Sequence, residues 1–511
     1  MGRSLAFAQA ALLALATSSA ASPLPVPAAR LHGKATARSN STGGISWGAC
    51  PDSFPSNVTC GTYSVPLDWD DPGSNETVEL GLVRIAAGDQ SRRIGNLFVN
   101  PGGPGGQASS LVTSIASRPG RVDARVLERF DVVGLDPRGV GLSTPVVCDP
   151  AAYNKRVSYF PKTQAEFDAL VAYNGALGAS CRAATGRLID FVDTVSAARD
   201  HEAVRAALGG EKVSLLGLSY GTQLFSQYAE LFPGSIRALV LDGNLQHSQG
   251  ESSNLLIEAT TYEATLKEFF RWCAGAAAEC PLSGRDVQAV YEGVRGMAAA
   301  SPIPAPGCDG TVCRSDMTDE DLRFIVQGGL ISPPSWPQLG QALAEAYAGN
   351  ATLLSQQQPL ATGDAYEDSY LFAGTAIACQ DWTHASSSLV DVLEKATLGA
   401  SFSPLTGGAC QSYKIQTSCI GWPAPLSNPP RPVSYAGPTR ILQAQSTLDP
   451  STSYAWALGL HAELGGDDRA VLLTRNGTGH TSYLRGGETT DALNAYLLDL
   501  TLPEPGTVFD T

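Results

Sequence analysis

The stretch that decides the fold is Lys212-Val213-Ser214-Leu215-Leu216-Gly217-Leu218-Ser219-Tyr220-Gly221. Its first half is a continuous apolar run, which is typical of a strand buried in a parallel sheet. Its second half, residues 217–221, has the Gly-x-Ser-x-Gly spacing in which a serine sits on a tight turn from a strand into a helix. Such a turn is crowded, so a side chain at either glycine would collide with the backbone. Residues 222–232 can form the helix that follows, and Ser219 is therefore the predicted nucleophile.

Apolar runs before and after this stretch predict the rest of a sheet. They are short, rich in β-branched residues, and most end in a glycine or a short polar residue. A helical pattern over residues 194–208 lies between the second and the third run. The order strand, helix, strand predicts a mostly parallel sheet and an α/β fold. The predicted strands are residues 95–100, 130–136, 212–217, 236–242, 439–444 and 469–474.

The sequence between the fourth and the fifth of these predicted strands has a different pattern. Helical segments around residues 255–274 and 320–327 are followed by loops that carry cysteine and proline. The region closes with six prolines from Pro423 to Pro438, which predict an extended and exposed segment. This pattern indicates a sheet that is interrupted by an insertion and then resumed.

The expected domain organisation follows from that interruption. Residues 45–245 would form the first part of the sheet-bearing core, and residues 431–511 its C-terminal part. Residues 246–430 would form a mainly helical, disulfide-bearing cap over the strand ends, where open α/β sheets bind ligands.

The N-terminus has the features of a targeting segment. A positive residue, an apolar core and the small residues Ser19-Ala20-Ala21 make residues 1–21 a predicted signal peptide, which implies a secreted, extracellular protein. Residues 22–44 are rich in Pro, Ala, Ser and Gly and predict a flexible lead. A membrane anchor is the alternative, but the segment is shorter than a bilayer requires and no later stretch is long and apolar enough, so no membrane association is expected.

Eleven cysteines agree with an oxidising compartment, because most of them fall as close pairs. Zinc binding is the alternative, but the chain has no Cys-x-x-Cys and no nearby pair of histidines to complete a tetrahedral site. Neither a metal nor another cofactor is predicted. The odd count leaves one thiol over, and Cys379, which has no close neighbour in sequence, is expected to be free. The predicted bridges are 50–60, 148–181, 273–280, 308–313 and 410–419.

Five Asn-x-Ser/Thr sequons are compatible with a glycoprotein. They begin at Asn40, Asn57, Asn75, Asn350 and Asn476.

The composition excludes several classes of protein. Apolar residues make up 43% of the 511 residues and charged residues 16%, which describes a folded chain and not a disordered one. Lys and Arg number 34 against 49 Asp and Glu, a formal charge of −15, and no basic run offers a surface for phosphates. No nucleic-acid partner is expected. The oligomeric state stays open.

A serine hydroxyl needs a general base, and the base needs an acid to orient it. In this class of fold the order along the chain is Ser, then Asp or Glu, then His. Among six histidines, His480 lies in a loop just after the last predicted strand, where the base belongs. Asp449, which follows the strand ending near residue 444, is the predicted acid, and Asp242 at the end of an earlier strand is the rival.

The oxyanion formed during acyl transfer needs backbone N–H donors. Residues 100–106 (Asn-Pro-Gly-Gly-Pro-Gly-Gly) follow a predicted strand and contain four glycines, so their backbone can approach a ligand closely. The N–H groups of Gly103 and Tyr220 are the predicted oxyanion hole. A phosphate-binding loop is the alternative, but the required glycine spacing and the Lys-Ser/Thr pair are missing.

Taken together, these motifs resemble the secreted α/β-hydrolases of the tripeptidyl aminopeptidase and prolyl aminopeptidase group. The resemblance covers nearly the whole mature chain. It implies an α/β-hydrolase fold with a helical cap, a C-terminal region of the tripeptidyl-aminopeptidase type, and a serine exopeptidase that releases tripeptides or single residues from peptide N-termini. The matching segments are residues 100–106, 136–143 (Asp-Pro-Arg-Gly-Val-Gly-Leu-Ser), 217–222, 239–243 (Leu-Val-Leu-Asp-Gly), 419–423 (Cys-Ile-Gly-Trp-Pro) and 479–480 (Gly-His).

By position, the resemblance carries the triad over to Ser219, Asp449 and His480, and the oxyanion donors to Gly103 and Tyr220. Prolyl aminopeptidases usually have His where this chain has Pro101, so the resemblance does not extend to a strict single-proline specificity.

An exopeptidase must recognise the free N-terminus of its peptide substrate, and a carboxylate in the cap that pairs with the α-amine would do so. The candidates are Glu251, Glu258, Glu263 and Asp381. A secreted esterase or amidase on small acyl substrates is the second interpretation, since the fold and triad are shared. A non-catalytic, hydrolase-like binding protein is the third.

Overall fold

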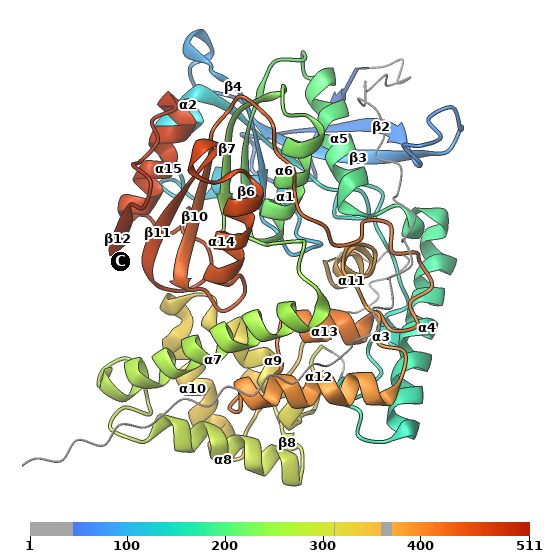
Figure 1. Ribbon diagram of the computed structural model, residues 1–511, viewed down its shortest axis with the longest axis vertical. Helices are drawn as coiled ribbons and strands as arrows, with labels where there is room; N and C mark the ends of the chain where they lie inside the picture. Colours follow the sequence, from blue (N-terminus) through green and yellow to red (C-terminus); the bar gives the residue numbers. More distant parts are fainter. Residues whose placement is uncertain (1–43, 311, 359–369, 511) are drawn as a thin grey trace, which may run out of the picture. The chain divides into compact units, whose positions relative to one another are not determined.

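A ten-stranded sheet forms the centre of this protein in the computed structural model, which describes residues 44–310, 312–358 and 370–510 (Figure 1). The predicted signal peptide, nearly all of the predicted lead and the sequon at Asn40 lie outside the described residues. The strand order is β1-β2-β3-β5-β4-β6-β7-β10-β11-β12. The strands are β1 (Ser46–Gly48), β2 (Thr59–Pro66), β3 (Thr77–Ile85), β4 (Gly95–Asn100), β5 (Phe130–Leu135), β6 (Val213–Leu218), β7 (Ile236–Asp242), β10 (Ile441–Leu448), β11 (Ala470–Thr478) and β12 (Val508–Asp510).

The sheet is mostly parallel, as the sequence predicts. All pairs from β5 to β12 are parallel, whereas β1, β2 and β3 form an antiparallel edge that sequence analysis did not identify. The register aligns Asn100 of β4 with Gly217 of β6, and Leu218 of β6 with Asp242 of β7. The carboxyl ends of these strands therefore meet at one edge, where the predicted catalytic motifs begin.

Helices cover both faces of the sheet. Along β6 and β7, neighbouring residues enter different cores: Leu215 and Leu241 pack with α5 and α6, whereas Leu216 and Val240 pack with α1 and α15. This alternation is what a strand buried on both faces requires. Outside the insertion the helices are α1 (Ala108–Ser117), α2 (Ala124–Arg129), α3 (Pro150–Tyr153), α4 (Gln164–Thr185), α5 (Thr194–Ala207), α6 (Tyr220–Leu231), α14 (Tyr454–Glu463) and α15 (Gly487–Asp499).

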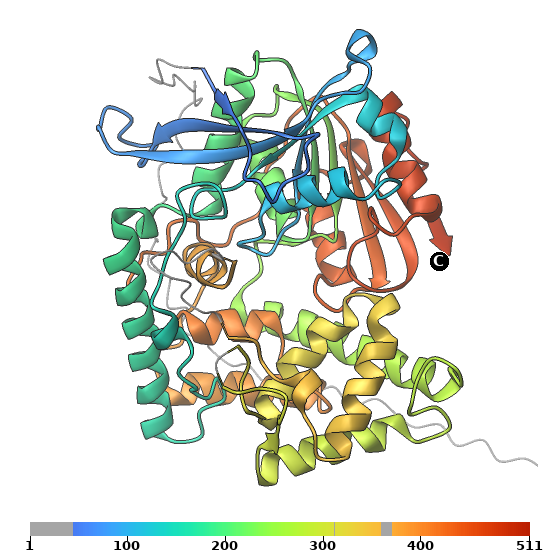
Figure 2. The same ribbon diagram turned by 180° about the vertical axis from the view of Figure 1, so that it is seen from behind.

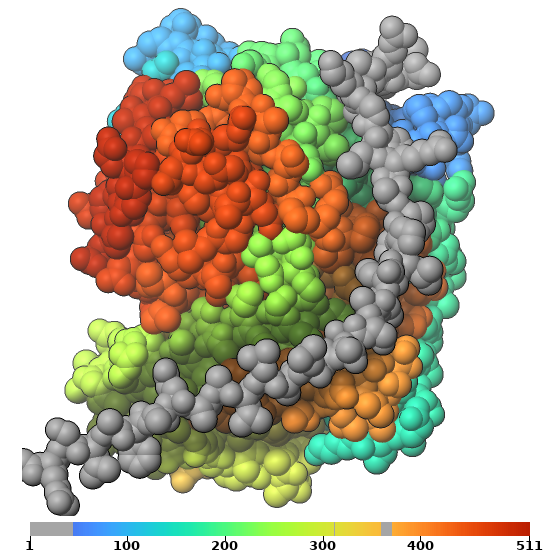
Figure 3. Space-filling model, in the orientation of Figure 1, coloured from blue at the N-terminus to red at the C-terminus, as the bar shows by residue number. Residues whose placement is uncertain are grey.

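The insertion joins β7 to β10, which are neighbours in the sheet. It is mainly helical, as predicted, and α8, α9 and α10 pack with part of α7 in a core of their own. The face drawn in Figure 3 shows the C-terminal part of the chain, in red, next to the yellow-green helices of the insertion. Its elements are α7 (Glu251–Gly275), α8 (Val287–Ala300), the short strands β8 (Ile303–Pro304) and β9 (Asp316–Met317), α9 (Asp319–Leu330), α10 (Trp336–Tyr347), α11 (Tyr370–Asp381), α12 (Leu389–Phe402) and α13 (Gln411–Ser418).

Helix α4 packs against the insertion, although its residues fall within the range 45–245 that was predicted to form the first part of the core. The side-chain amide of Asn174 donates to the carbonyls of Thr417 and Ile420, at 2.8 and 2.9 Å. Phe167 of the same helix shares a small core with residues of α7, α12 and α13. Figure 2 shows α4, in teal, running beside the orange helices of the insertion. The insertion thus has a wall that comes from outside its own residue range.

Four of the predicted disulfides are confirmed: 50–60, 148–181, 273–280 and 308–313. The predicted bridge 410–419 is wrong, because α13 lies between these two cysteines. At 1.5 Å per residue the helix separates them by about 13 Å, roughly twice the reach of a disulfide. Cys419 instead bonds Cys379, with their Cα atoms 5.2 Å apart. The free thiol is Cys410, which is buried, and not Cys379.

The proline-rich segment from Pro423 to Pro438 has no helix or strand, as predicted, but it is not exposed throughout. Asn428, Val433 and Tyr435 are buried, and the last two pack in the core on one face of the sheet. Among the described residues, no helix has both the length and the hydropathy that crossing a membrane requires. Of the described sequons, those at Asn57, Asn75 and Asn476 are exposed, whereas Asn350 is half-buried.

Candidate active site

Ser219 sits on a strained turn between β6 and α6. Its backbone has φ 57° and ψ −126°, and a positive φ is unfavourable for a residue with a side chain. The turn persists because its surroundings hold it: the N–H of Ser219 donates to the carbonyl of Asp242 at 2.9 Å. A Cβ on Gly217 would lie 2.3 Å from the carbonyl oxygen of Gly221, and one on Gly221 would lie 2.8 Å from that of Asn100. Both glycines are therefore required by close backbone approach.

His480 and Asp449 form a hydrogen-bonded pair at the ends of β11 and β10. Nδ1 of His480 is 2.8 Å from Oδ2 of Asp449 and 3.0 Å from Oδ1. Asp449 is fully buried, and its carboxylate also accepts from the N–H groups of Ser451 and Thr452, each at 2.9 Å. The His480 side chain is 15% exposed, and its Nε2 makes no hydrogen bond with any described residue.

This pairing shifts both pKa values away from each other. Burial favours the neutral form of His480, but the Asp449 carboxylate outweighs that effect and raises the pKa of the imidazole above its ordinary value of 6.5. Burial likewise favours a neutral Asp449, but the charge and hydrogen bond of His480 lower the pKa of the carboxyl below 3.8. The geometry thus holds Asp449 ionised against the ring.

Asp242, the rival acid, is placed differently. It is fully buried, and its Oδ2 accepts from the N–H groups of Ser482 and Tyr483, each at 2.7 Å. It makes no hydrogen bond to the ring of His480 among the described contacts. Asp242 therefore fastens the loop that carries His480, while Asp449 contacts the ring itself.

The glycine-rich loop after β4 packs directly against the Ser219 turn. A Cβ on Gly102 would lie 2.7 Å from Cβ of Ser219 and 2.9 Å from the backbone nitrogen of Tyr220. Within the described residues, the N–H groups of Gly103 and Tyr220 form no hydrogen bond. Two free donors next to a serine side chain are what an oxyanion hole requires.

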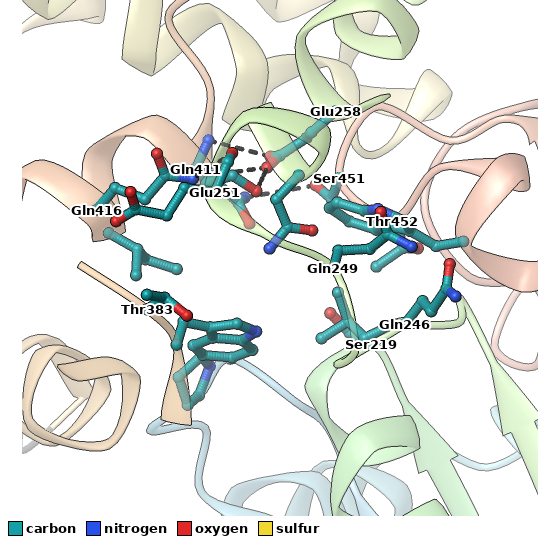
Figure 4. Close-up of a pocket in the computed structure, with 18 residues that line it drawn as sticks. Ser219, Gln246, Gln249, Glu251, Glu258, Thr383, Gln411, Gln416, Ser451 and Thr452 are labelled. Atoms are coloured by element: carbon teal, nitrogen blue, oxygen red, sulfur yellow. Dashed lines mark hydrogen bonds between the residues drawn. The ribbon is translucent and has the colours of Figure 1, made fainter. Parts of the chain in front are cut away.

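Ser219 lies where two hollows meet. One, which we call the Glu258 pocket, is rich in amides and contains two carboxylates; Figure 4 draws Ser219 on one side of it and Glu258, with its hydrogen bonds, on another. The other, which we call the His480 cleft, contains both Ser219 and His480. The Glu258 pocket is lined mainly by Gln246, Gln249, Glu251, Asn254, Glu258, Trp382, Thr383, Gln411 and Gln416. The His480 cleft is lined by Gly103, Gly328, Ile331, Gly374, Lys414, Ser418 and Ser451, among others.

The four predicted substrate carboxylates separate into two kinds. Glu251 and Glu258 line the Glu258 pocket. Glu263 is buried in the insertion, where it accepts from the N–H groups of residues 405 and 406. Asp381 is fully buried and accepts from Thr194 and Asn428, and it lines neither hollow. The structure therefore gives Asp381 a place in the core, and not in the substrate pocket that sequence analysis predicted for it.

One contact of the site was not predictable from motifs. The backbone N–H of His480 donates to the carbonyl of Ile331 at 2.8 Å, and Arg485 donates to the same oxygen at 2.8 Å. Ile331 caps α9, so it belongs to the insertion. The position of the imidazole thus depends on a residue nearly 150 positions away, which no local pattern reveals.

Comparison with known proteins agrees with this fold. The family described as α/β hydrolase fold matches residues 95–292, and the family described as TAP-like protein matches residues 403–509. The serine protease Hip1 of Mycobacterium tuberculosis is 30% identical over 497 residues, which cover 90% of each chain. Carboxylesterase B of the same organism is 30% identical over 496 residues, covering 90% of this chain and 88% of the relative.

The tripeptidyl aminopeptidase of Streptomyces lividans is 26% identical over 468 residues, which cover 89% of this chain and 84% of that protein. The matches to these relatives span the sheet, the insertion and the C-terminal strands together, and the names of the relatives are those of hydrolases that differ in substrate. The chain therefore belongs to the α/β-hydrolases with a TAP-like C-terminal region, and it is a serine hydrolase.

Proposed function

We propose that this protein is a secreted aminopeptidase that releases short pieces from the N-termini of peptides through an acyl-enzyme on Ser219. The observation that carries the proposal is the state of Glu258, which lines the pocket beside Ser219. Its carboxylate is 1% exposed and accepts four hydrogen bonds from neutral donors, and within the described residues it pairs with no cation. Its negative charge is thus available to an ammonium group that enters the pocket.

The proposed reaction follows the serine-hydrolase scheme. Nε2 of His480 takes the proton of the Ser219 hydroxyl as its oxygen attacks the scissile carbonyl, and Asp449 stabilises the imidazolium through Nδ1. The N–H groups of Gly103 and Tyr220 bind the oxyanion. The imidazolium then gives its proton to the leaving amine, the C–N bond breaks, and water attacks the acyl-enzyme with His480 again as the base.

Glu258 is a better candidate for the substrate amine than its neighbour Glu251. Glu251 already pairs with the ammonium of Lys395 and accepts from the N–H of Ala385. Burial raises the pKa of Glu258, and the hydrogen bonds from residues 327, 411 and 412 act against that rise. A bound α-ammonium would favour the ionised carboxylate further.

Secretion is supported by the five disulfides of the described chain, because such bonds persist in oxidising compartments. Expression in a secreting host should yield a mature protein that begins near residue 22 and that loses mass on enzymatic removal of N-glycans. Recovery of the protein only from the cytosol, with residue 1 intact, would contradict this part of the proposal.

The central test compares peptides of graded length with a free or an acetylated N-terminus, with the released pieces identified by mass spectrometry. We expect acetylation to lower kcat/KM by about tenfold to a thousandfold, because it leaves a charged carboxylate without its partner in a closed pocket. Ser219→Ala should abolish turnover and labelling by a fluorophosphonate probe. The masses of the released pieces also show how many residues are removed at each cut.

Glu258→Gln is the variant that isolates the amine-binding role, and Glu263→Gln on the same helix is its matched control. Glu258→Gln should raise KM for free-amine peptides and leave the slower cleavage of acetylated peptides unchanged, whereas Glu263→Gln should change neither. Equal cleavage of free and acetylated peptides, with faster cleavage of small acyl esters, would replace this proposal by the esterase alternative. The relative named Carboxylesterase B supports that alternative.

A further inference from the structure

Among the described residues, the ammonium of Lys414 of α13 is held by aromatic rings alone. Its Nζ lies 5.6 Å from the ring centroid of Tyr159 and 5.6 Å from that of Phe324. The side chain is half-buried, and Nζ forms no hydrogen bond or ion pair with any residue that the structure describes. Burial lowers the pKa of this lysine, and the charges of Asp321 and Glu320 only partly oppose that effect. An ammonium in such surroundings is poorly compensated and favours an anionic ligand.

Lys414 also connects two hollows. It lines the His480 cleft together with Ser219, and it lines an adjoining cavity of about 340 Å³, which we call the Lys414 cavity. Tyr153 is shared by the same two hollows. A ligand that occupies the Lys414 cavity can therefore be part of a substrate whose reacting carbonyl lies at Ser219.

The carboxylates of the Lys414 cavity are already engaged. Oδ2 of Asp321 accepts from Arg156 at 3.0 Å and from the N-terminal residue Thr318 of the α9 capping box. Glu320 accepts from the hydroxyl of Ser158 at 2.8 Å and from the N–H of residue 159 at 2.6 Å. Neither carboxylate forms an ion pair with Lys414.

Arg314 is the second uncompensated cation in the cavity. Its Nε donates to the neutral side chain of Gln356 at 3.0 Å, and within the described part of the chain it forms no ion pair. Burial lowers the pKa of Arg314, which remains charged because a guanidinium titrates far above neutral pH. The cavity therefore presents two half-buried cations, Arg314 and Lys414, that lack an anionic partner among the described residues; Lys155, which also lines the cavity, is exposed.

We propose that Arg314 and Lys414 bind a carboxylate of the peptide substrate, so that the enzyme favours peptides with a negative charge on the side of the scissile bond that enters the His480 cleft. The carboxylate is either the C-terminus of a short peptide or an Asp or Glu side chain. This inference rests on the proposed peptidase function. It gives the site opposite charges in its two hollows, with Glu258 in one and Lys414 in the other.

The test uses two matched series of peptides with free N-termini. In one series the C-terminus is either an acid or an amide, and in the other an internal residue is either Glu or Gln at each position in turn. The purified full-length enzyme should cleave the preferred acid peptide at least tenfold more efficiently, in kcat/KM, than its neutral counterpart. The series that shows the preference identifies the source of the carboxylate.

Lys414→Met keeps the length and apolar stem of the side chain and removes the charge. It should lower kcat/KM about tenfold for acid peptides through KM, and leave neutral peptides unchanged. Lys414→Arg should restore most of the preference, and Arg314→Gln should reduce it. Lys267→Met removes an exposed lysine from α7 and is the control. It should leave kcat/KM unchanged for both acid and neutral peptides.

Two results would overturn the inference. The first is that the unmodified enzyme shows no preference for acid over neutral peptides. The second is that Lys414→Met lowers kcat/KM equally for acid and for neutral peptides. Ester substrates distinguish this failure from a failure of the peptidase proposal. If no peptide is cleaved, the same enzymes are compared on esters whose acyl chain ends either in a carboxylate or in an amide. A preference for the acid-ended ester then supports the carboxylate site, and its absence refutes it.

Discussion

At the residue scale, the two buried aspartates near His480 have separable tasks. Asp449 contacts the ring, so Asp449→Asn should lower kcat about a thousandfold or more, because the imidazole loses the anion that fixes its tautomer. Asp242 accepts two backbone N–H groups of the neighbouring loop, so Asp242→Asn should act mainly on the free energy of unfolding. Steady-state kinetics and urea denaturation of both variants check this. The reverse ranking would transfer the acid role to Asp242.

The raised pKa of His480 predicts a particular pH dependence. The base must be neutral in the free enzyme, so kcat/KM should fall as pH decreases through the pKa of the imidazole. Because Asp449 raises that pKa, the midpoint of the acidic limb should lie above 6.5 in the unmodified enzyme. In Asp449→Asn the residual activity should have its midpoint at lower pH. A midpoint that does not move would show that another group controls the limb.

At the scale of elements, helix α13 explains why the cysteine prediction failed. Spacing alone favoured a bridge between its two flanking cysteines, but an eight-residue helix holds them apart and brings Cys419 to α11. The bridge to Cys379 closes a sequence separation of 40 residues. In the chain-entropy account, a loop of that size stabilises the fold by about 4 kcal/mol.

This assignment predicts different outcomes for two cysteine variants. Cys419→Ala should lower the free energy of unfolding by about 4 kcal/mol and leave Cys379 reactive toward maleimide in the unfolded protein. Cys410→Ala should leave the bridge in place and cost about 1–2 kcal/mol, the loss from truncating one buried side chain. Urea denaturation and non-reducing peptide mapping measure both. A mapped peptide that joins residues 410 and 419 would refute the assignment.

Strands that form a continuous apolar run were predicted well, and elements with a mixed pattern were not. The predicted strands near residues 95, 130, 212, 236, 439 and 469 are all present, because each is a short apolar run buried on both faces. Strand β2 was missed because it alternates buried and exposed residues and contains Thr, Ser and Gly. Helix α4 was also missed, and only its tertiary contacts show that it serves the insertion.

At the scale of the whole molecule, the predictable part of the candidate site is the part that chemistry fixes locally. Ser219 and His480 lie in short motifs at strand ends, and the sheet register brings those ends together. The substrate side of the site was less predictable. Both Glu258 and Asp381 were predicted as substrate carboxylates, but Asp381 lies in the core and Glu258 in a pocket wall, because tertiary packing decides where a helix face points.

The hydrogen bond from the His480 N–H to the carbonyl of Ile331 has a consequence for damaged molecules. Proteolysis or local unfolding of the insertion would widen access to Ser219, because residues of the insertion line both hollows beside it. The same event would also remove the hydrogen bond that supports the imidazole loop. We therefore expect a molecule that loses its insertion to lose activity, and not to cleave a wider range of substrates.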